Sequence, residues 1–209
     1  MKILDNINII LVEPINGGNV GSVCRSINNN GINNLRIVNP NKQIDWSEAK
    51  KLACNAKPQL DKIKIYKSLK DAISDCTIVA GTTARTGFYR ETSLTIDEFA
   101  AIGLENAKKN KIGIVFGRED KGLFNNEIAL CTHLIQIPSH NQYKSINLSH
   151  AVMICCYELY KISGNFKASE EKSEIASSEL RERMFELWKE MMIETNFTQK
   201  QKLDHMMMG

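Results

Sequence analysis

Short apolar runs alternate with amphipathic stretches over roughly the first 160 residues of the chain. The runs are rich in β-branched residues and predict buried strands, while apolar residues at every third or fourth position predict helices. This alternation is typical of βαβ units, so we predict an α/β fold with a mostly parallel six-stranded sheet and helices on both faces. The predicted strands are residues 7–12, 35–38, 63–66, 77–80, 112–116 and 134–137.

Helices are predicted between these strands and after the last one. We expect Asn19 to cap the first helix and Asp97 to cap the fourth, because short polar side chains accept hydrogen bonds from free N–H groups at a helix start. The composition then changes, and residues 163–179 predict a linker, since Ser, Glu, Lys and Gly offer little to bury. The expected domains are 1–162, the linker, and a short C-terminal helical extension at 180–209. The predicted helices are residues 20–30, 47–54, 68–74, 97–109, 148–160 and 180–195.

Composition limits the class of protein without naming a function. Apolar residues make up 43% of the chain and charged residues 24%, as in ordinary globular proteins. No apolar run is long enough to cross a membrane and no leader precedes the first strand, so we expect a cytoplasmic protein. The six cysteines form no Cys-x-x-Cys pair and the four histidines have no metal-ligand spacing, so we predict reduced cysteines and no metal. The net charge of +3 permits nucleic-acid binding without requiring it.

Polar loops follow several predicted strands, notably at residues 117–123 and 138–147. In an open α/β sheet, the loops at the carboxyl ends of the strands form the ligand crevice. We therefore predict the active site at this edge of the sheet.

The glycine-rich loop at residues 16–21 suggests a nucleotide site, but its spacing does not fit the dinucleotide fingerprint. The second strand also ends in Val38-Asn39-Pro40, without the acid that would hold a ribose. No Gly-Lys-Ser/Thr motif is present, which excludes a P-loop. A nicotinamide-dependent oxidoreductase remains only as an alternative. Arg25, in the helix after this loop, would by itself be interpreted as a surface arginine.

Three motifs change this interpretation when they are considered together: Asn19-Val20-Gly21-Ser22-Val23-Cys24-Arg25, Phe116-Gly117-Arg118-Glu119 with Gly122-Leu123, and Ser145-Ile146-Asn147-Leu148. In this order they resemble the SpoU branch of the SPOUT methyltransferases, most closely the TrmJ group of tRNA ribose 2′-O-methyltransferases. The resemblance covers roughly residues 7–160. The loop Gly81-Thr82-Thr83-Ala84-Arg85 also resembles that group, whose C-terminal helical extension is longer.

The resemblance implies that the C-terminal part of the sheet is threaded into a trefoil knot, an exception to the rule that chains avoid threading. S-adenosyl-L-methionine would bind in this knot and leave as S-adenosyl-L-homocysteine. The family also forms a homodimer in which the arginine of the first motif reaches the cofactor held by the partner, and we expect the interface to bury Val20, Val23, Ile154 and Tyr157. The cofactor contacts carried over from the family are Thr82, Thr83, Ala84, Gly117, Ile137, Lys144, Ser145, Ile146 and Leu148.

The resemblance also implies catalytic roles for Arg25, Asn19, Glu119, Ser145 and Asn147. In the family the arginine is proposed to remove the 2′-hydroxyl proton. A guanidinium with a pKa above about 12 is a poor base, so we expect Arg25 to hold the adjacent phosphate and stabilise the alkoxide, while the proton passes to phosphate or water. Glu119 is expected to orient Asn19 or Arg25. Ser145 and Asn147 could equally cap the helix at 148.

For the partner, the resemblance implies RNA, and most specifically tRNA with a cytidine or uridine at the first anticodon-loop position. The alternatives are ribosomal RNA, another tRNA position, or a knotted RNA-binding protein without catalysis. Cationic side chains around the expected crevice are the candidates for RNA contact, because a polyanion must approach there. These candidates are Arg25, Arg85, Arg90, Arg118 and Lys121.

Overall fold

The computed structural model describes residues 3–84, 93–167 and 174–197. Its sheet has seven strands in the order β3-β2-β1-β6-β4-β7-β5, and every neighbouring pair is parallel. The predicted α/β class and parallel sheet are confirmed, but the count of six strands was wrong. The additional strand is β5 (Ser93–Thr95), which pairs with β7 at one edge. Its three residues are too few to show an alternating pattern.

The other strands lie close to their predicted positions. Their bounds are β1 Ile7–Val12, β2 Asn34–Val38, β3 Lys64–Tyr66, β4 Ile78–Thr82, β6 Ile112–Phe116 and β7 His133–Gln136. β6 is inserted between β1 and β4, and β4 lies between β6 and β7, so the chain crosses over repeatedly in its C-terminal half. The trefoil knot stays a prediction.

Helices connect the strands and follow the last one. Asn16, rather than Asn19, caps α1, and Thr95, rather than Asp97, is the cap of α5. The Thr95 N–H donates to the Glu98 carboxylate at 2.8 Å. The bounds are η1 Ile3–Asn6, α1 Gly17–Asn29, α2 Trp46–Ala53, η2 Cys54–Ala56, α3 Lys57–Leu60, α4 Leu69–Ala72, α5 Ile96–Ala107, α6 Asn125–Ile128 and α7 Leu148–Ile162.

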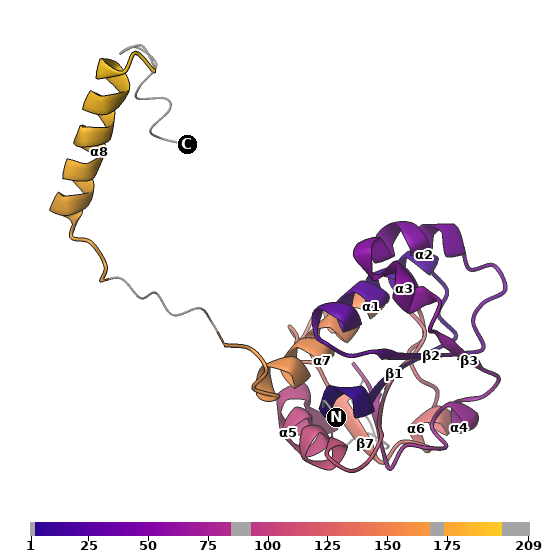
Figure 1. The fold of residues 1–209 in the computed structure, drawn as a ribbon. Helices are drawn as coiled ribbons and strands as arrows, with labels where there is room; N and C mark the ends of the chain where they lie inside the picture. Colours follow the sequence, from indigo (N-terminus) through magenta and orange to yellow (C-terminus); the bar gives the residue numbers. More distant parts are fainter. Residues whose placement is uncertain (1–2, 85–92, 168–173, 198–209) are drawn as a thin grey trace. The chain divides into compact units, whose positions relative to one another are not determined.

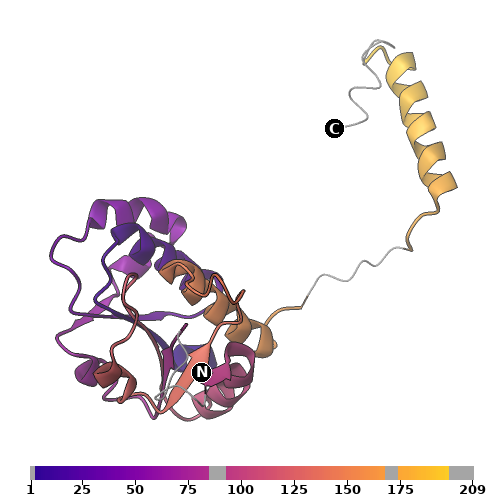
Figure 2. The same ribbon diagram turned by 180° about the vertical axis from the view of Figure 1, so that it is seen from behind.

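The helices cover both faces of the sheet, as predicted. Successive side chains of a strand point to opposite faces. Ile9 of β1 therefore packs in the core with α1, α5 and α7, whereas Ile10 packs in a second core with α4 and α6. Figures 1 and 2 show α4 and α6 on the side of the sheet opposite to α1. With both faces covered, the carboxyl edge of the sheet is left for a binding site.

Two glycines of the glycine-rich loop explain how α1 meets α2. A Cβ atom on Gly17 would lie 2.0 Å from the carbonyl oxygen of Asp45, and one on Gly21 would lie 2.2 Å from that of Ala49. Any side chain there would push the two helices apart. These glycines are therefore required for backbone contact between helices, a different cause from phosphate binding.

The chain divides into two units, residues 1–167 and 168–209. In the second, α8 (Ser178–Glu194) begins two residues before the helix predicted at 180, and Ser177 caps it. The last part of the predicted extension, residues 198–209, lies outside the described residues. Among the residues that the structure covers, no helix is long and apolar enough to span a bilayer, and no three His, Cys, Asp or Glu side chains gather as metal ligands.

Candidate active site

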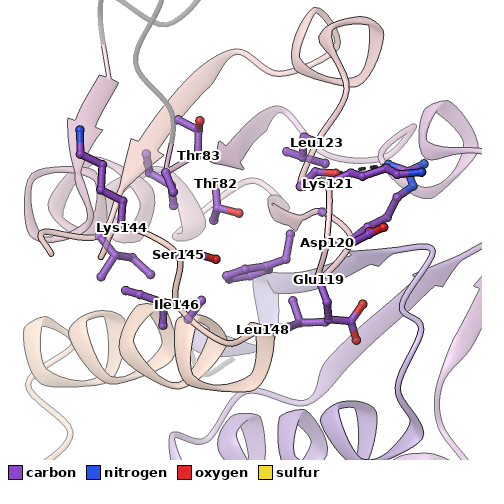
Figure 3. Close-up of a pocket in the computed structure, with 18 of the residues that line it drawn as sticks. Thr82, Thr83, Glu119, Asp120, Lys121, Leu123, Lys144, Ser145, Ile146 and Leu148 are labelled. Atoms are coloured by element: carbon purple, nitrogen blue, oxygen red, sulfur yellow. Dashed lines mark hydrogen bonds between the residues drawn. The ribbon is translucent and has the colours of Figure 1, made fainter. Parts of the chain in front are cut away.

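A cavity of about 690 Å³ lies at the carboxyl edge of the sheet, beyond β4, β6 and β7 (Figure 3). This is the edge at which ligands bind in open α/β sheets. All nine residues predicted to contact a cofactor line this cavity, and so does Glu119. Their contact with a cofactor stays a prediction. The nine are Thr82, Thr83, Ala84, Gly117, Ile137, Lys144, Ser145, Ile146 and Leu148.

The lining of the cavity combines apolar and polar residues. Phe116, Ile135 and Leu148 are buried apolar residues in its lining. The Thr82 hydroxyl donates to the Val115 carbonyl oxygen at 3.0 Å, which fixes its side chain. Figure 3 shows Thr82 and Ser145 directed into the cavity from different segments, while Lys144 extends away from it. Such a lining suits a ligand with one flat apolar part and several polar groups.

The loop after β6 is held tightly by its own backbone. Arg118 and Gly122 exchange two backbone hydrogen bonds, at 3.2 and 2.9 Å. A Cβ atom on Gly117 would lie 2.1 Å from the carbonyl carbon of Gly122, and Gly122 has a φ of +66°. Both glycines are therefore needed to close this loop, whatever ligand it meets.

Arg118 belongs to this loop, and its side chain is bound by two carboxylates. Its side chain is 8% exposed; it donates to Glu127 at 2.9 and 3.0 Å and to Glu13 at 2.7 Å, and it lies 4.1 Å from the ring centre of Phe124. Burial opposes the charged form, but the hydrogen bonds to Glu127 and Glu13 outweigh it and raise the pKa of Arg118. Because its guanidinium is enclosed and already paired, this geometry does not favour the predicted contact of Arg118 with RNA, which stays a prediction.

Glu119 points in the other direction and connects two of the three motifs. Its carboxylate accepts hydrogen bonds from the N–H groups of Ile15 and Asn16, at 3.0 and 3.2 Å, and from the Asn19 amide at 3.0 Å. Of the two partners expected for Glu119, the structure therefore selects Asn19 over Arg25. The carboxylate fixes the entry into α1 relative to the loop after β6.

Asn147 extends this network to the third motif. Its amide donates to the Asn19 side-chain oxygen at 3.1 Å, and its own oxygen accepts from the N–H groups of Ser149 and His150. Asn147 therefore caps α7, which confirms one of its two expected roles, and also holds Asn19; its catalytic role stays a prediction. Ser145 does not cap the helix; it lines the cavity.

Arg25 is separate from this arrangement. It is exposed on α1, with its Nη1 atom 3.7 Å from the Cys54 sulfur, and it is not among the described residues that line the cavity. The structure of one chain therefore does not bring Arg25 to Glu119 or Ser145.

The predicted dimer interface needs correction at two residues. Val20 and Val23 are fully buried in the core of their own chain and cannot face a partner. Their place on the apolar face of α1 identified them as buried, but not what buries them. Ile154 is half-buried and Tyr157 is 51% exposed, so both remain available.

Of the other RNA candidates, Lys121 is exposed in the loop at the cavity, whereas Arg85 and Arg90 lie outside the described residues. Sequence reasoning missed Glu13 and Glu127, which hold Arg118. The sequence contained one indication of the position of Glu127, because a glutamate three residues after a helix cap often bonds back to it. In the structure its carboxylate accepts a hydrogen bond from the Phe124 N–H at 2.7 Å. The sequence contained no such indication for Glu13, at the end of β1.

The SpoU rRNA Methylase family model matches residues 6–157. The tRNA (cytidine-2′-O-)-methyltransferase TrmJ of Methanocaldococcus jannaschii is 41% identical over 180 residues, covering 81% of this chain and 77% of the relative. The tRNA (cytidine/uridine-2′-O-)-methyltransferase TrmJ of Pectobacterium atrosepticum is 37% identical over 156 residues, covering 75% of this chain. The chain spans only 64% of the length of that second relative.

Solved structures with a similar fold include methyltransferases. TrmJ from Z. mobilis superposes with a TM-score of 0.70 at 27% identity, covering 95% of this chain and 85% of that one. The SpoU methyltransferase AviRb from Streptomyces viridochromogenes, solved with AdoMet, shares the fold with a TM-score of 0.59 at 18% identity, covering 78% of this chain and 60% of that one. The extent of the family match and the identity to the relatives lead to one conclusion: this chain belongs to the SpoU methylase family of RNA methyltransferases.

Proposed function

We propose that the protein methylates the ribose 2′-hydroxyl of tRNA with S-adenosylmethionine, at a cytidine or uridine in the first anticodon-loop position. One observation carries the proposal: three separated motifs meet at one edge of the sheet, with nine predicted cofactor residues around a single cavity and Asn19, Glu119 and Asn147 joined by hydrogen bonds beside it. The names of the relatives from M. jannaschii and P. atrosepticum support tRNA as the substrate.

The cavity fits the proposed cofactor by volume and by chemistry. About 690 Å³ lies within the range of small-molecule sites, roughly 300–1,000 Å³. Ile137, Ile146 and Leu148 would contact the adenine, while Thr82, Thr83 and Ser145 would meet the polar groups. When bound, S-adenosylmethionine supplies an electrophilic methyl group on its sulfonium. The protein's own task is then to position the hydroxyl and to help its proton leave.

Arg25 is the residue that we assign to this task. A ribose hydroxyl is a weak nucleophile, and a fixed cation near its oxygen and the adjacent phosphate would stabilise the negative charge that develops there. Arginine stays protonated and so acts as a charge, with the proton passing to phosphate or water. Asn19, Glu119 and Asn147 act by holding the start of α1, the helix that carries Arg25.

Because Arg25 does not line the cavity of its own chain, we propose that it serves the cavity of a second copy in a homodimer. Mixed dimers test this directly. R25A keeps an intact cavity, while G117V keeps Arg25 but has a side chain where none fits. If Arg25 acts across the dimer, exchange between the two inactive variants restores about a quarter of the activity, because half of the dimers are mixed and each has one complete site. No recovery, or only monomer in sedimentation at micromolar concentration, contradicts the dimer.

The product identifies the substrate. Purified protein is incubated with S-adenosylmethionine and either total tRNA or ribosomal RNA, and the nucleosides are then analysed by mass spectrometry. A 2′-O-methylated pyrimidine from tRNA alone supports the proposal, whereas a product from ribosomal RNA replaces it. Calorimetric binding of S-adenosylmethionine distinguishes an enzyme from a knotted RNA-binding protein that has lost its cofactor, and binding of a nicotinamide nucleotide would indicate an oxidoreductase.

A further inference from the structure

Positive charge is concentrated in one part of the chain. Residues 42–70 contain eight lysines and three acidic residues, a net charge of +5, while the whole chain has +3. The rest of the chain is therefore slightly negative. All eight lysines are exposed, and none of them forms an ion pair with any carboxylate in the described part of the chain. By contrast, Lys108, Lys111 and Lys161, on other elements, each pair with an acid.

Part of this positive segment lies beside Arg25. Figures 1 and 2 show α2 and α3 beside α1, and the glycine contacts described above bring the backbones of α1 and α2 together. Arg25 lies 3.7 Å from the sulfur of Cys54, whose thiol in turn contacts the Lys51 carbonyl oxygen at 3.7 Å. Lys50 and Lys51 lie one turn before Cys54, and Lys57 follows it by three residues. We call Arg25, Lys50, Lys51 and Lys57 the Arg25 patch.

The chemistry of the patch suits a polyanion. Residues 49–60 contain three lysines and no acid. Of the two acids just before them, Asp45 caps α2, and one carboxylate oxygen of Glu48 lies 2.9 Å from where a Cβ atom on Gly18 would be. Exposed amides of Asn28 on α1 and Asn55 on η2 add hydrogen-bonding groups next to the cations. Unpaired cations interspersed with amides match a nucleic-acid backbone, with its phosphates and sugar hydroxyls.

We propose that the Arg25 patch is a docking surface for the substrate RNA, on which lysines of α2 and α3 bind the phosphates that flank the target nucleotide. The inference rests on the proposed function, in which Arg25 meets the phosphate beside the target ribose. An RNA strand whose ribose lies at Arg25 must continue on both sides of it, and the neighbouring surface offers Lys50, Lys51 and Lys57. If Arg25 serves the partner's cavity, one tRNA contacts both subunits.

The test is the salt dependence of tRNA binding by the full chain. A labelled tRNA transcript is titrated with wild type and with K50Q/K51Q/K57Q at several salt concentrations. Each lost phosphate contact lowers the slope of log K against log salt by about 0.7–0.9. Three lost contacts therefore lower the slope by about 2–3 and weaken binding about 10- to 100-fold near physiological salt. In turnover, the KM for tRNA rises while kcat at saturating tRNA is kept.

A matched control removes the same charge elsewhere. K108Q/K109Q/K161Q changes three exposed lysines near the C-terminal ends of α5 and α7. Lys161 is 13 residues beyond the cavity residue Leu148, about 20 Å along α7. This control, and the charge-preserving K50R/K51R/K57R, should bind tRNA as wild type does. Equal affinity and slope for K50Q/K51Q/K57Q and the control overturn the docking surface.

The readouts also separate this inference from the proposed function. S-adenosylmethionine binding by calorimetry should be the same in wild type and K50Q/K51Q/K57Q. If wild type binds no cofactor or methylates no tRNA, the proposed function fails. If it does both, and K50Q/K51Q/K57Q binds tRNA with the wild-type slope, only the docking surface fails. If K50R/K51R/K57R loses binding as K50Q/K51Q/K57Q does, charge is not what the patch contributes, and the inference is wrong.

Discussion

Helix α1 carries two polar residues, Asn19 and Arg25, that differ in how they are held by the rest of the chain. Asn19, in its first turn, is hydrogen-bonded to both Glu119 and Asn147, and so is fixed by two other loops. Arg25, less than two turns later, is exposed, and among the described residues its side chain has one long hydrogen bond, to the Cys54 sulfur. The cavity edge is therefore preorganised within one chain, whereas Arg25 is left available for a group outside it. If Arg25 serves the cavity of a second copy, as proposed, one chain can bind the cofactor, but the catalytic site is complete only in the dimer.

Three arginines of the chain differ in the same way. Arg118 and Arg36 are buried and paired with carboxylates, Glu127 and Asp75 respectively, while Arg25 has no carboxylate partner in the described part of the chain. A guanidinium with its charge compensated supports the fold. One without such compensation retains its capacity for phosphate.

The largest effect is expected at the unpaired arginine. R25A removes the cation proposed to stabilise the developing alkoxide, so kcat should fall about 10²- to 10³-fold, the typical cost of losing such a group. The Kd for S-adenosylmethionine should be unchanged, because we assign Arg25 to the target ribose and its phosphate and not to holding the cofactor. Single-turnover kinetics and calorimetry measure the two. C54S is the control, since it alters only the sulfur beside Arg25; turnover in R25A equal to that of C54S removes Arg25 from the site.

Replacement of the paired arginine, Arg118, should lower both stability and cofactor binding. R118M keeps the apolar stem but leaves Glu127, whose side chain is 10% exposed, without its cation, so the free energy of unfolding should fall by about 3 kcal/mol or more. Cofactor binding should weaken as well, because the loop at Arg118 lines the cavity. Urea unfolding and calorimetry measure these changes. R118M/E127Q should recover part of the stability, whereas a fully stable R118M would show that the pair contributes little.

A smaller effect is expected where Glu119 holds Asn19. E119Q replaces a carboxylate that accepts from three N–H donors by an amide with one acceptor oxygen, so one donor meets the new NH₂ group. We expect a loss of about 1–2 kcal/mol in stability and a lower kcat, because α1 starts from these bonds. D120N, the adjacent exposed acid, should leave the free energy of unfolding unchanged. Equal stability of the two variants would refute the holding role.

Much of this arrangement could be predicted from the sequence, and the successes have a common cause. β1 and β6 were predicted at their observed bounds because each is a continuous apolar run, buried along its whole length. α6 and β5 were missed because four and three residues carry no measurable period. α1 was predicted to start three residues late, since glycines disfavour helices by propensity. Contact with α2 overrides that preference at Gly17 and Gly21.

For the site, the family resemblance predicted nine residues that line the cavity, but neither the separate position of Arg25 nor how charges would pair. Arg118 and Glu119 are neighbours in sequence, yet they point to different partners. The partners of Arg118 lie 105 and 9 residues away, at Glu13 and Glu127. A charged residue in a loop looks the same in sequence whether it is enclosed or free. Only the three-dimensional arrangement distinguishes Arg118 from Arg25, and for that reason the sequence placed both among the RNA candidates.

The smallest effects are expected in the pH dependence of the free energy of unfolding. Asp75 and Glu13 should contribute to it from opposite edges of the sheet. Hydrogen bonds from Arg36 and Lys111 lower the pKa of Asp75, which precedes β4, and the hydrogen bond from Arg118 lowers the pKa of Glu13, which follows β1. A carboxyl group whose pKa is lower in the folded chain stabilises the fold above its unfolded pKa of about 4, and that stabilisation is lost as the pH falls toward the folded value. Both side chains are about 40% exposed, so solvent screening limits each contribution to about 1 kcal/mol.

The variants D75N and E13Q test separately how each edge of the sheet contributes to the pH dependence of unfolding and of cofactor binding. In D75N, the drop in free energy of unfolding between pH 7 and pH 2.5 should be about 1 kcal/mol smaller than in wild type, because the titrating group is gone. The pH dependence of S-adenosylmethionine binding should be unchanged. E13Q should change both, since Glu13 holds the side chain of Arg118, a residue of the cavity loop. Urea unfolding and calorimetry at matched pH values measure these differences. Identical pH profiles of cofactor binding in E13Q and D75N would mean that the Glu13 and Arg118 pair supports the sheet alone, and that the cavity loop does not depend on it.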